Sequence, residues 1–421
     1  MSYAVYSMIG YGHFRAAYPL RGFAELVRAD NYEGIPKGDR ALWWLLSSGY
    51  AGITRSADLP LLGRLSFLSF DYFQRVPSFY PRRDLSRPNL ALLFIYGLIG
   101  IGFGRDLIRK LSREPLPMIS TYFIPAFMAE HYEYPGEIYC LVCDADIART
   151  WAPLRPRESR VKYLAPTQRV AERLKDYGIK EENIKLTGFP LPMELIGEDM
   201  SVLKEDFSRR LPNLDPSGVF IDKYAPLLKE KLGGLPESSD HPLTIMFSVG
   251  GTGVQAKLGA ELLRKLASKL ARGEMRLVIS VGVRRELRDY YSRWMDKLGL
   301  RGLSDEGITL VFDESPEGYI RKFNESLRRS DILWTKPSEL SFYAALGIPI
   351  LASKPVGSHE VSNLRWLIKG GYGMAQGDIK YLDQWFFDWL RSGYFAEKAI
   401  EGFLELEKLG VLRVREAVLG R

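Results

Sequence analysis

Apolar runs and segments of helical periodicity alternate along the second half of the chain. Five short apolar runs have the character of buried strands: 243–249, 276–281, 308–312, 331–335 and 348–352. Between them lie segments with apolar residues at helical spacing: 256–270, 284–298, 317–329 and 338–346. Strands that alternate with helices predict a parallel sheet covered on both faces. We therefore predict a doubly wound α/β domain over residues 241–375.

The first half of the chain repeats this alternation less regularly. It shows strand patterns at 3–9, 118–122, 138–143 and 161–165, and helix patterns at 14–28 and 167–177. A first α/β domain is therefore predicted over residues 1–195. Residues 196–240 are rich in charge, proline and serine and are predicted to be a linker with a helical insertion. Residues 376–421 read as amphipathic helices without a strand, and a return to the N-terminal domain is one arrangement open to them.

Length and composition agree with two domains. A chain of 421 residues exceeds the roughly 250–300 residues that one hydrophobic core serves. Hydrophobic residues make up 46% and charged residues 26%, the balance of a folded soluble protein. Cys140 and Cys143 lie in one apolar run and face opposite sides of its strand. We therefore predict two buried, unbridged thiols in a reducing cytoplasm.

The formal net charge of +7 suits either an anionic lipid surface or a nucleic acid. No nucleic-acid motif accompanies the scattered basic residues, so we predict no nucleic-acid partner. A solvated basic surface and a membrane-facing surface both stay open, because aromatic residues interleave with the charges: Phe67, Phe70, Tyr72, Phe73, Phe79 and Tyr80. The longest apolar stretch, 90–103, is shorter than the roughly 18–20 residues that cross a bilayer. We expect a cytoplasmic protein, either free or peripheral at the inner face of the membrane.

Two glycine turns follow predicted strands. Gly10-Tyr11-Gly12-His13 lacks the third glycine of a dinucleotide fingerprint. Its His13 is a candidate general base, with a purely structural hydrogen bond as the alternative. Gly250-Gly251-Thr252-Gly253 has no Walker lysine, but its glycines allow close approach to a pyrophosphate and the following helix adds its dipole. We predict phosphate binding at this second turn.

The strand at 331–335 brings further polar residues to the crevice where open α/β sheets bind ligands. These residues are Thr335, Lys336, Ser338 and Glu339. Glu339 is either a helix cap or an acceptor of hydrogen bonds from ribose hydroxyls. His359 and Glu360 suggest a zinc-binding helix, but Asn363 stands where the second histidine would be, so we predict no metal.

Four segments together resemble the GT-B transferases of the glycosyltransferase family 28 type. That group includes the monogalactosyldiacylglycerol synthases and the N-acetylglucosaminyltransferase that makes lipid II. The segments are 10–17, 185–190, 250–253 and the block from Thr335 through Gly347-Ile348-Pro349 to Glu360 and Asn363. The resemblance implies a GT-B fold, in which two doubly wound Rossmann-like domains face each other across a cleft. It also implies an inverting transferase that needs no metal or cofactor, with a UDP-sugar as donor and a hydroxyl acceptor, for which a lipid is one choice.

The resemblance also implies roles for residues. The donor side would comprise Gly12, Gly250, Gly251, Thr252, Gly253, Gly282, Arg284, Thr335, Lys336, Ser338, Glu339, His359, Glu360 and Asn363. His13 would lie near the acceptor, and Asp144 and Asp146, at the end of another strand, are second candidates for the general base. The acidic residue that holds the ribose in the family is replaced by Phe342, so the base of the donor stays open. A nucleotide-sugar epimerase and a non-catalytic nucleotide-sugar-binding protein are the alternative functions.

Overall fold

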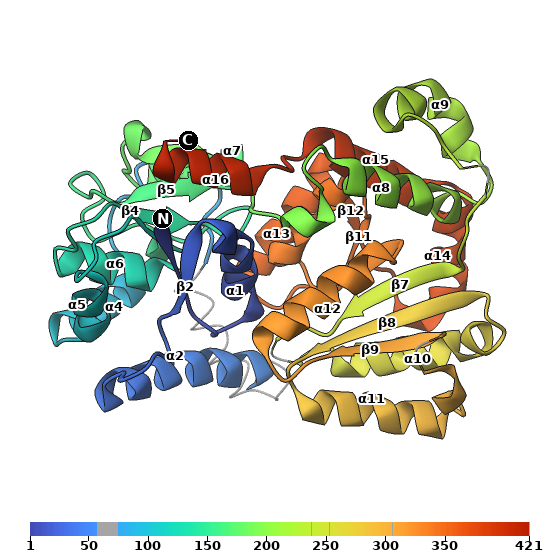
Figure 1. The fold of residues 1–421 in the computed structure, drawn as a ribbon, viewed down its shortest axis with the longest axis horizontal. Helices are drawn as coiled ribbons and strands as arrows, with labels where there is room; N and C mark the ends of the chain where they lie inside the picture. Colours follow the sequence, from blue (N-terminus) through green and yellow to red (C-terminus); the bar gives the residue numbers. More distant parts are fainter. Residues whose placement is uncertain (57–74, 237, 252, 305, 421) are drawn as a thin grey trace. The chain divides into compact units, whose positions relative to one another are not determined.

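Two six-stranded parallel sheets, one in each of two units, organise the chain (Figure 1). The computed structural model describes residues 1–56, 75–236, 238–251, 253–304 and 306–420. Unit 1 comprises Met1–Pro192, Val356–Asn363 and Glu407–Arg421, and unit 2 comprises Met193–Pro355 and Leu364–Leu406. The predicted fold class, two doubly wound α/β domains, is confirmed.

The sheet of unit 1 has the strand order β2-β1-β3-β4-β5-β6. Its strands are β1 (Ser2–Tyr6), β2 (Ala24–Arg28), β3 (Met118–Ser120), β4 (Ile138–Leu141), β5 (Lys162–Ala165) and β6 (Ile184–Leu186). All neighbouring pairs are parallel. From β1 the chain passes to β2, which pairs with one edge of β1. The next strand, β3, pairs with the other edge of β1. The topological switch point, where ligands of open sheets bind, therefore lies between β1 and β3.

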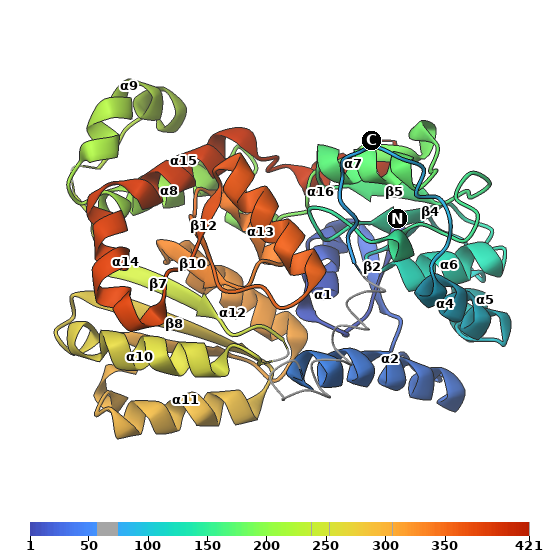
Figure 2. The same ribbon diagram turned by 180° about the vertical axis from the view of Figure 1, so that it is seen from behind.

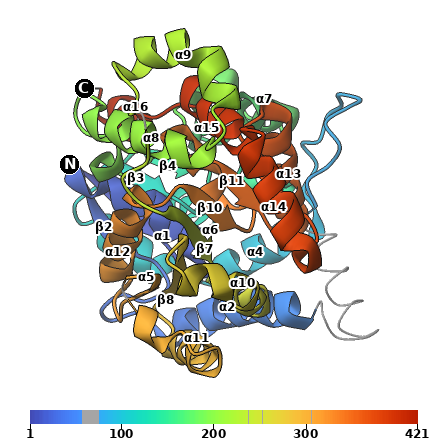
Figure 3. The same cartoon turned by 90° about the vertical axis from the view of Figure 1, so that its right-hand side faces the viewer.

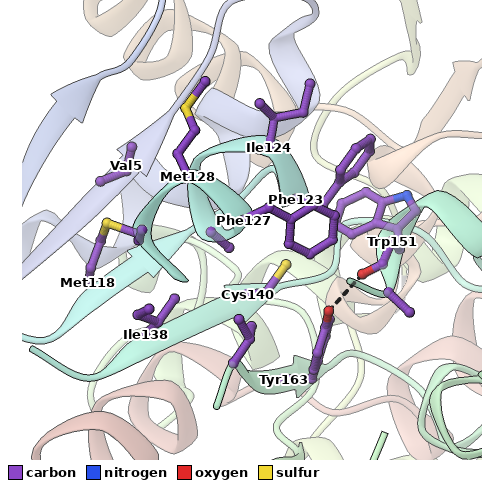
Figure 4. Close-up of a cluster of buried hydrophobic side chains, with 14 of the residues drawn as sticks. Val5, Met118, Phe123, Ile124, Phe127, Met128, Ile138, Cys140, Trp151 and Tyr163 are labelled. Carbon is purple, nitrogen blue, oxygen red and sulfur yellow. Dashed lines mark hydrogen bonds between the residues drawn. The ribbon is translucent and has the colours of Figure 1, made fainter. Parts of the chain in front are cut away.

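Helices and the sheet of unit 1 enclose an apolar core. The helices are α1 (Tyr11–Ala17), η1 (Tyr18–Gly22), α2 (Lys37–Ser56), α4 (Leu90–Gly100), α5 (Arg105–Leu111), α6 (Phe123–His131), η2 (Arg149–Trp151), α7 (Gln168–Asp176), η3 (Glu181–Asn183) and α16 (Gly410–Leu419). Figure 4 shows side chains of β3, β4 and α6 packed together, with the Tyr163 hydroxyl donating to the Trp151 carbonyl at 2.8 Å. Cys140 and Cys143 are both buried and free, as predicted, and burial raises the pKa of the Cys140 thiol.

One predicted helix of unit 1 is wrong. The pattern at 14–28 was expected to be helical throughout, but α1 ends at Ala17, and β2 then pairs with β1 in the register Ser2↔Ala24 to Tyr6↔Arg28. The 3₁₀ helix Tyr18–Gly22 follows, with Pro19 in its first turn. Proline removes a backbone donor and glycine is a poor helix former, so the helix stops and the chain is released to form a strand.

The sheet of unit 2 has the strand order β12-β11-β10-β7-β8-β9. Its strands are β7 (Leu243–Ser248), β8 (Met275–Gly282), β9 (Ile308–Phe312), β10 (Ile332–Thr335), β11 (Ile350–Ala352) and β12 (Gly373–Ala375). Read from the other edge, the order corresponds to 3-2-1-4-5-6, that of a dinucleotide-binding sheet. Its switch point lies between β7 and β10.

Helices cover both faces of the unit 2 sheet: α12 lies on one face, and α10 and α11 on the other (Figures 1 and 2). The helices are η4 (Met193–Leu195), α8 (Ser201–Leu214), α9 (Val219–Leu232), α10 (Ala256–Ala271), α11 (Arg285–Lys297), η5 (Arg301–Leu303), α12 (Pro316–Arg328), η6 (Glu339–Leu346), α13 (Ser358–Gly370), η7 (Ile379–Tyr381), α14 (Leu382–Arg391) and α15 (Tyr394–Glu405). Within the predicted linker, residues 201–214 form α8 and residues 219–232 form α9, and the two helices contact each other and α15 (Figure 3). The pattern at 338–346 is a 3₁₀ helix, and Gly347 ends it at φ +61°.

The sequence raised two points about membranes: the length of the apolar stretch 90–103 and the aromatic residues interleaved with basic ones. Among the described residues, no single helix is long and apolar enough to span a bilayer, whereas α4 and α5 together pass that test as a pair bent by 68°. Of the interleaved aromatic residues, Phe67, Phe70, Tyr72 and Phe73 lie outside the described residues. Phe79 lies under the guanidinium groups of Arg82 and Arg169, and Tyr80 is exposed.

Candidate functional site

The glycine loop of unit 2 lies at the switch point of its sheet. It follows β7 and leads into α10, and the neighbouring strand β10 ends at Thr335, just before Lys336. The two strand ends lie close together, because a Cβ atom added to Gly250 would lie 3.6 Å from Cε of Lys336. The structure thus brings Gly250 and Lys336 to the place where sheets of this topology bind their ligands.

The loop has a backbone that only glycine adopts without strain. Gly250 and Gly253 have φ of +78° and +72°. A Cβ atom on Gly253 would lie 2.7 Å from Nη1 of Arg284, so the guanidinium group rests directly against bare peptide backbone. Thr252, predicted to contact phosphate, lies outside the described residues. The loop therefore presents main-chain groups next to the positive charge of Arg284.

Helix α10 adds the positive end of its dipole to the loop. The side chain of Gln255, the N-cap residue of α10, makes no capping hydrogen bond. Its first turn is held in place by the Tyr291 hydroxyl, which donates to the Ala256 carbonyl at 3.0 Å, and burial raises the pKa of Tyr291. The Ala256 amide donates to the Gly253 carbonyl at 3.1 Å, and the N–H groups that follow it in the first turn are suited to an anion.

Arg284 and Lys336 bring positive side chains to the loop from two directions. Arg284 precedes α11, two residues after Gly282, which ends β8 at φ +78°. In the part of the chain that the structure describes, no carboxylate pairs with Arg284. Lys336 is half-buried after β10. A diphosphate at this place would meet main-chain donors and two cations.

Polar atoms buried near the strand ends lack protein partners within the described residues. They are Oγ1 of Thr335 and Oε1 of Gln255, whose Nε2 donates to Ser353. Such atoms cost about 1–3 kcal/mol each unless water or a ligand satisfies them. Ser338 is 9% exposed and precedes η6, and Glu339 lies half-buried in its first turn. The region therefore has unused hydrogen-bonding capacity beside the glycine loop.

Phe342 occupies the position of the missing acidic residue. It is buried, and its ring centroid lies 5.0 Å from that of Trp366, which in turn lies 5.1 Å from that of Tyr372. The Phe342 side chain therefore packs in an aromatic cluster of unit 2. Glu339 is the nearest acidic residue along the chain to this position, three residues before it.

His13 lies at the switch point of unit 1. Its Nδ1 contacts the carbonyl oxygen of Thr121, just after β3, at 2.7 Å. A carbonyl only accepts, so Nδ1 carries the proton and Nε2 carries the lone pair in the neutral ring. The Sγ of Cys143 donates to the same oxygen at 3.4 Å. The carboxyl ends of β1, β3 and β4 therefore converge around one carbonyl.

Aromatic rings surround His13. Its ring centroid lies 4.6 Å from that of Tyr122 and 6.4 Å from that of Trp151. The predictions from sequence missed both rings. Tyr122 could have been found, because it ends the strand pattern at 118–122, whereas Trp151 reaches the site through a 3₁₀ turn far along the chain.

The two candidate aspartates have different surroundings. Asp146 accepts from Nε and Nη2 of Arg173 at 2.9 and 3.0 Å, and Arg173 is 1% exposed. Burial opposes the charge on Arg173, but hydrogen bonds to Asp146 outweigh it and raise the pKa of the guanidinium. Asp144 accepts from Nδ2 of Asn363 at 2.9 Å. Asp146 thus belongs to a buried ion pair, which makes it a poorer general base than Asp144.

The predicted donor residues divide between the two units. Gly250 to Gly253, Gly282, Arg284, Thr335, Lys336, Ser338 and Glu339 belong to unit 2, whereas Gly12, His359, Glu360 and Asn363 belong to unit 1. Gly12 lies within α1. Glu360 is 2% exposed and accepts from the Val356 amide at 2.8 Å.

His359 and Asn363 lie in the part of α13 that belongs to unit 1. Nε2 of His359 lies 4.0 Å from Oε1 of Glu360. Oδ1 of Asn363 accepts from the Ala145 amide at 2.8 Å, so Asn363 fixes the turn after β4. No group of three or more metal-ligating side chains occurs among the residues described.

Comparisons with known proteins identify the fold. The family described as a domain of unknown function, DUF6938, matches residues 289–366, which include Lys336 and Glu339 but not the glycine loop. No curated protein sequence matches the chain. The structure of MurG from Acinetobacter baumannii aligns over 100% of both chains, with a TM-score of 0.50 and 11% sequence identity. This likeness, together with the two parallel sheets, confirms the GT-B fold.

Two further solved structures align at lower scores. The UDP-GlcNAc 2-epimerase from Neisseria meningitidis, bound to UDP-GlcNAc, aligns over 100% of both chains with 11% identity and a TM-score of 0.46. The spinosyn rhamnosyltransferase SpnG, complexed with thymidine diphosphate, covers 99% of this chain and 100% of its own, with 14% identity and a TM-score of 0.45.

Proposed function

We propose that this chain is an inverting glycosyltransferase that moves a sugar from a nucleotide-diphosphate donor, a UDP-sugar, to an acceptor hydroxyl without a bound metal. The observation that carries this proposal is the switch point of unit 2, where Gly250 and Gly253 lie next to Lys336 and Arg284 and the N-terminus of α10 follows. A nucleotide diphosphate leaves with negative charge. Preorganised main-chain donors and cations stabilise such a leaving group without a metal ion.

The acceptor side of the reaction would use unit 1. The acceptor oxygen attacks the anomeric carbon, the bond from that carbon to the diphosphate breaks, and the configuration inverts. The proton of the acceptor hydroxyl passes to Nε2 of His13, and the Thr121 carbonyl holds the Nδ1–H of the imidazolium that forms. Tyr122, whose ring lies against that of His13, would contact the acceptor, and the buried Trp151 would support the two rings from the core. Asp144 is the second candidate base.

The remaining predicted donor residues have secondary roles in this proposal. Thr335 and Ser338 would offer hydroxyl groups to the nucleotide from the end of β10. Glu339 would accept hydrogen bonds from the ribose in place of the acid that Phe342 replaces. The segment from Gly282 to Arg284 would lie near the base.

Replacing Arg284 tests the diphosphate site. Arg284→Gln should weaken UDP binding about tenfold to a hundredfold, because a hydrogen bond to a charged group contributes about 1.5–3 kcal/mol. Isothermal titration calorimetry with UDP measures this. The matched control is Arg285→Gln, because Arg285 is 64% exposed and pairs with Glu314. Equal effects of the two changes, or none of Arg284→Gln, would remove the diphosphate assignment.

Replacing His13 tests the base. His13→Ala should lower the turnover of donor and acceptor by about a hundredfold to ten-thousandfold while UDP affinity is kept, because general base catalysis contributes that much. His131→Ala, which changes an exposed histidine, serves as the control. Product analysis with a panel of UDP-sugars and hydroxyl acceptors must show an inverted glycoside. A released epimer, or donor binding without turnover for any acceptor, would contradict the transferase.

A further inference from the structure

Helix α4 of unit 1 has an apolar face that no part of the described protein covers. Its sequence, Leu90 to Gly100, contains no charged residue. Leu90, Leu93, Phe94 and Ile101 are 66%, 46%, 55% and 79% exposed. They recur at i, i+3, i+4 and i+11, which places them on one side of a helix with 3.6 residues per turn. Single exposed apolar residues are ordinary, but a continuous apolar face indicates an interaction surface.

The opposite face of α4 is anchored in the core of unit 1. Leu92, Ile95 and Ile99 are 0%, 7% and 0% exposed, and the Tyr96 ring stacks on Phe127 with centroids 5.6 Å apart. A helix with one side packed in the protein does not expose all of its surface to lipid. The apolar face can therefore lie in an interface but not pass through a bilayer.

Basic residues follow directly after this face. Arg105, Arg109 and Arg113 recur at every fourth position and are exposed, and Arg109 is 72% exposed although it pairs with Asp106. The turn that joins them to α4 is fixed: Gly104 has φ +81°, and a Cβ atom there would lie 2.2 Å from Sδ of Met128. The Gly104 amide also donates to Oδ2 of Asp39 at 3.2 Å.

From this arrangement we propose that unit 1 binds an anionic lipid bilayer, with the exposed face of α4 in the headgroup region and the arginines after it on lipid phosphates. Apolar residues beside a basic stripe have the composition of membrane-surface segments, and positive charge near an anionic leaflet adds attraction. The charge of the arginines matches lipid phosphate and favours this occupant over a neutral protein surface. The net charge of +7 acts in the same direction.

Vesicle flotation with the full chain, in the absence of any nucleotide sugar, tests the bilayer. The chain should float with vesicles of phosphatidylglycerol and phosphatidylcholine and stay behind with pure phosphatidylcholine, and salt should weaken its binding. Equal binding to both vesicles, or binding to neither, would overturn the proposal. Because no donor is present, this outcome is independent of the transferase activity.

Variants on the exposed face test the place. Leu93→Ser with Phe94→Ser should lower vesicle affinity at least about tenfold, since each side chain loses its apolar burial. Changing Arg105, Arg109 and Arg113 to Gln should lower it about fivefold per charge. The control, Val219→Ser with Ile368→Ser, removes side chains of unit 2 that are 58% and 51% exposed. Controls that weaken binding as much as the α4 variant would contradict the assignment.

A label on the face gives a second reading that does not depend on loss of binding. An environment-sensitive fluorophore attached after Leu93→Cys should shift to the blue with anionic vesicles, and the same label after Val219→Cys should not. An unshifted label at position 93 on bound vesicles would overturn the proposal. So would a dimer in solution that Phe94→Ser converts to a monomer, because a second copy would then cover the face.

Discussion

Two histidines, one in each unit, are held by oxygens of different character. His13 contacts a carbonyl, which places a proton on Nδ1 and so fixes the tautomer of the neutral ring. His241 lies between two carboxylates: Nε2 is 3.0 Å from Asp331 and Nδ1 is 2.6 Å from Asp240. Both carboxylates accept, so His241 satisfies them only as an imidazolium. One ring is suited to take up a proton and the other to keep one.

The buried carboxylate makes the charge of His241 part of the fold. Asp331 is fully buried and also accepts from the Thr244 amide at 2.8 Å and from Asn213 at 3.0 Å. The hydrogen bond to Asp331 raises the pKa of His241, against an opposing contribution from burial. Loss of the proton would leave the carboxylate of Asp331 less well compensated.

The stability of the chain should therefore depend on the protonation of His241. Because its pKa is raised on folding above the unfolded value of about 6.5, the imidazolium contributes its full stability below about pH 6.5. That contribution is lost as the pH rises through the folded-state pKa. The free energy of unfolding of His241→Gln should fall furthest below that of the wild type near pH 5.5, and the difference should shrink toward pH 9. Urea unfolding followed by circular dichroism measures this difference.

His131→Gln, at an exposed site, should give the same difference from wild type at every pH. A constant penalty for His241→Gln, or one that grows toward alkaline pH, would show that the imidazolium is not what stabilises this site.

At the scale of elements, the sequence predicted the parts that place the donor loop. Residues 243–249 and 332–334 are mostly apolar because helices cover both faces of a parallel sheet, so burial removes the polar alternation. A glycine turn ends the first of these strands, and Lys336-Pro337 follows the second. Since the carboxyl ends of strands at a switch point share one crevice, the meeting of Gly250 and Lys336 follows from topology alone.

Strand β2 shows where periodicity is insufficient. The spacing of apolar residues at 14–28 continues through Pro19 and Gly22, although the backbone chemistry of those two residues ends the helix. The strand that follows gains its stability from pairing with β1, a contact that no local pattern records. Residues 338–346 show a smaller difference of the same kind. Their spacing predicts an α-helix, but they form a 3₁₀ helix that ends before Gly347 in the left-handed conformation.

Hydrogen bonds between residues far apart in the sequence could not be predicted, because they depend on the path of the whole chain. Asn363 binds Asp144 across 219 positions, and Gln255 donates to Ser353 across 98. The resemblance implies a donor role for Asn363, and the structure adds that its side-chain amide fixes the turn after β4 in unit 1. Residue identity predicted a polar role for it, but the unit to which it belongs depends on how the chain crosses between units.

At the scale of the molecule, neither unit is a continuous stretch of sequence. Residues 407–421 follow unit 2 along the chain but belong to unit 1. There α16 buries Val411, Val414 and Val418, and the Tyr139 hydroxyl of β4 donates to the Ala417 carbonyl at 3.3 Å. A Cβ atom on Gly410 would lie 2.2 Å from the Phe189 carbonyl oxygen, so the return path fits closely.

This connectivity makes the end of the chain a support for a distant sheet. Val414 is fully buried, so Val414→Asp should destabilise unit 1 by about 3 kcal/mol or more, because an unpaired charge is placed in an apolar contact. Hydrogen exchange read by mass spectrometry should show faster exchange first in β4 to β6, more than 220 residues away from the change in sequence. The strands β7 and β8 of unit 2 should keep their protection at the same temperature. Leu412→Asp, two residues away at a side chain 36% exposed, should leave both sheets unchanged. Faster exchange that appears equally in both sheets would mean that the two units unfold together and that α16 does not support unit 1 separately.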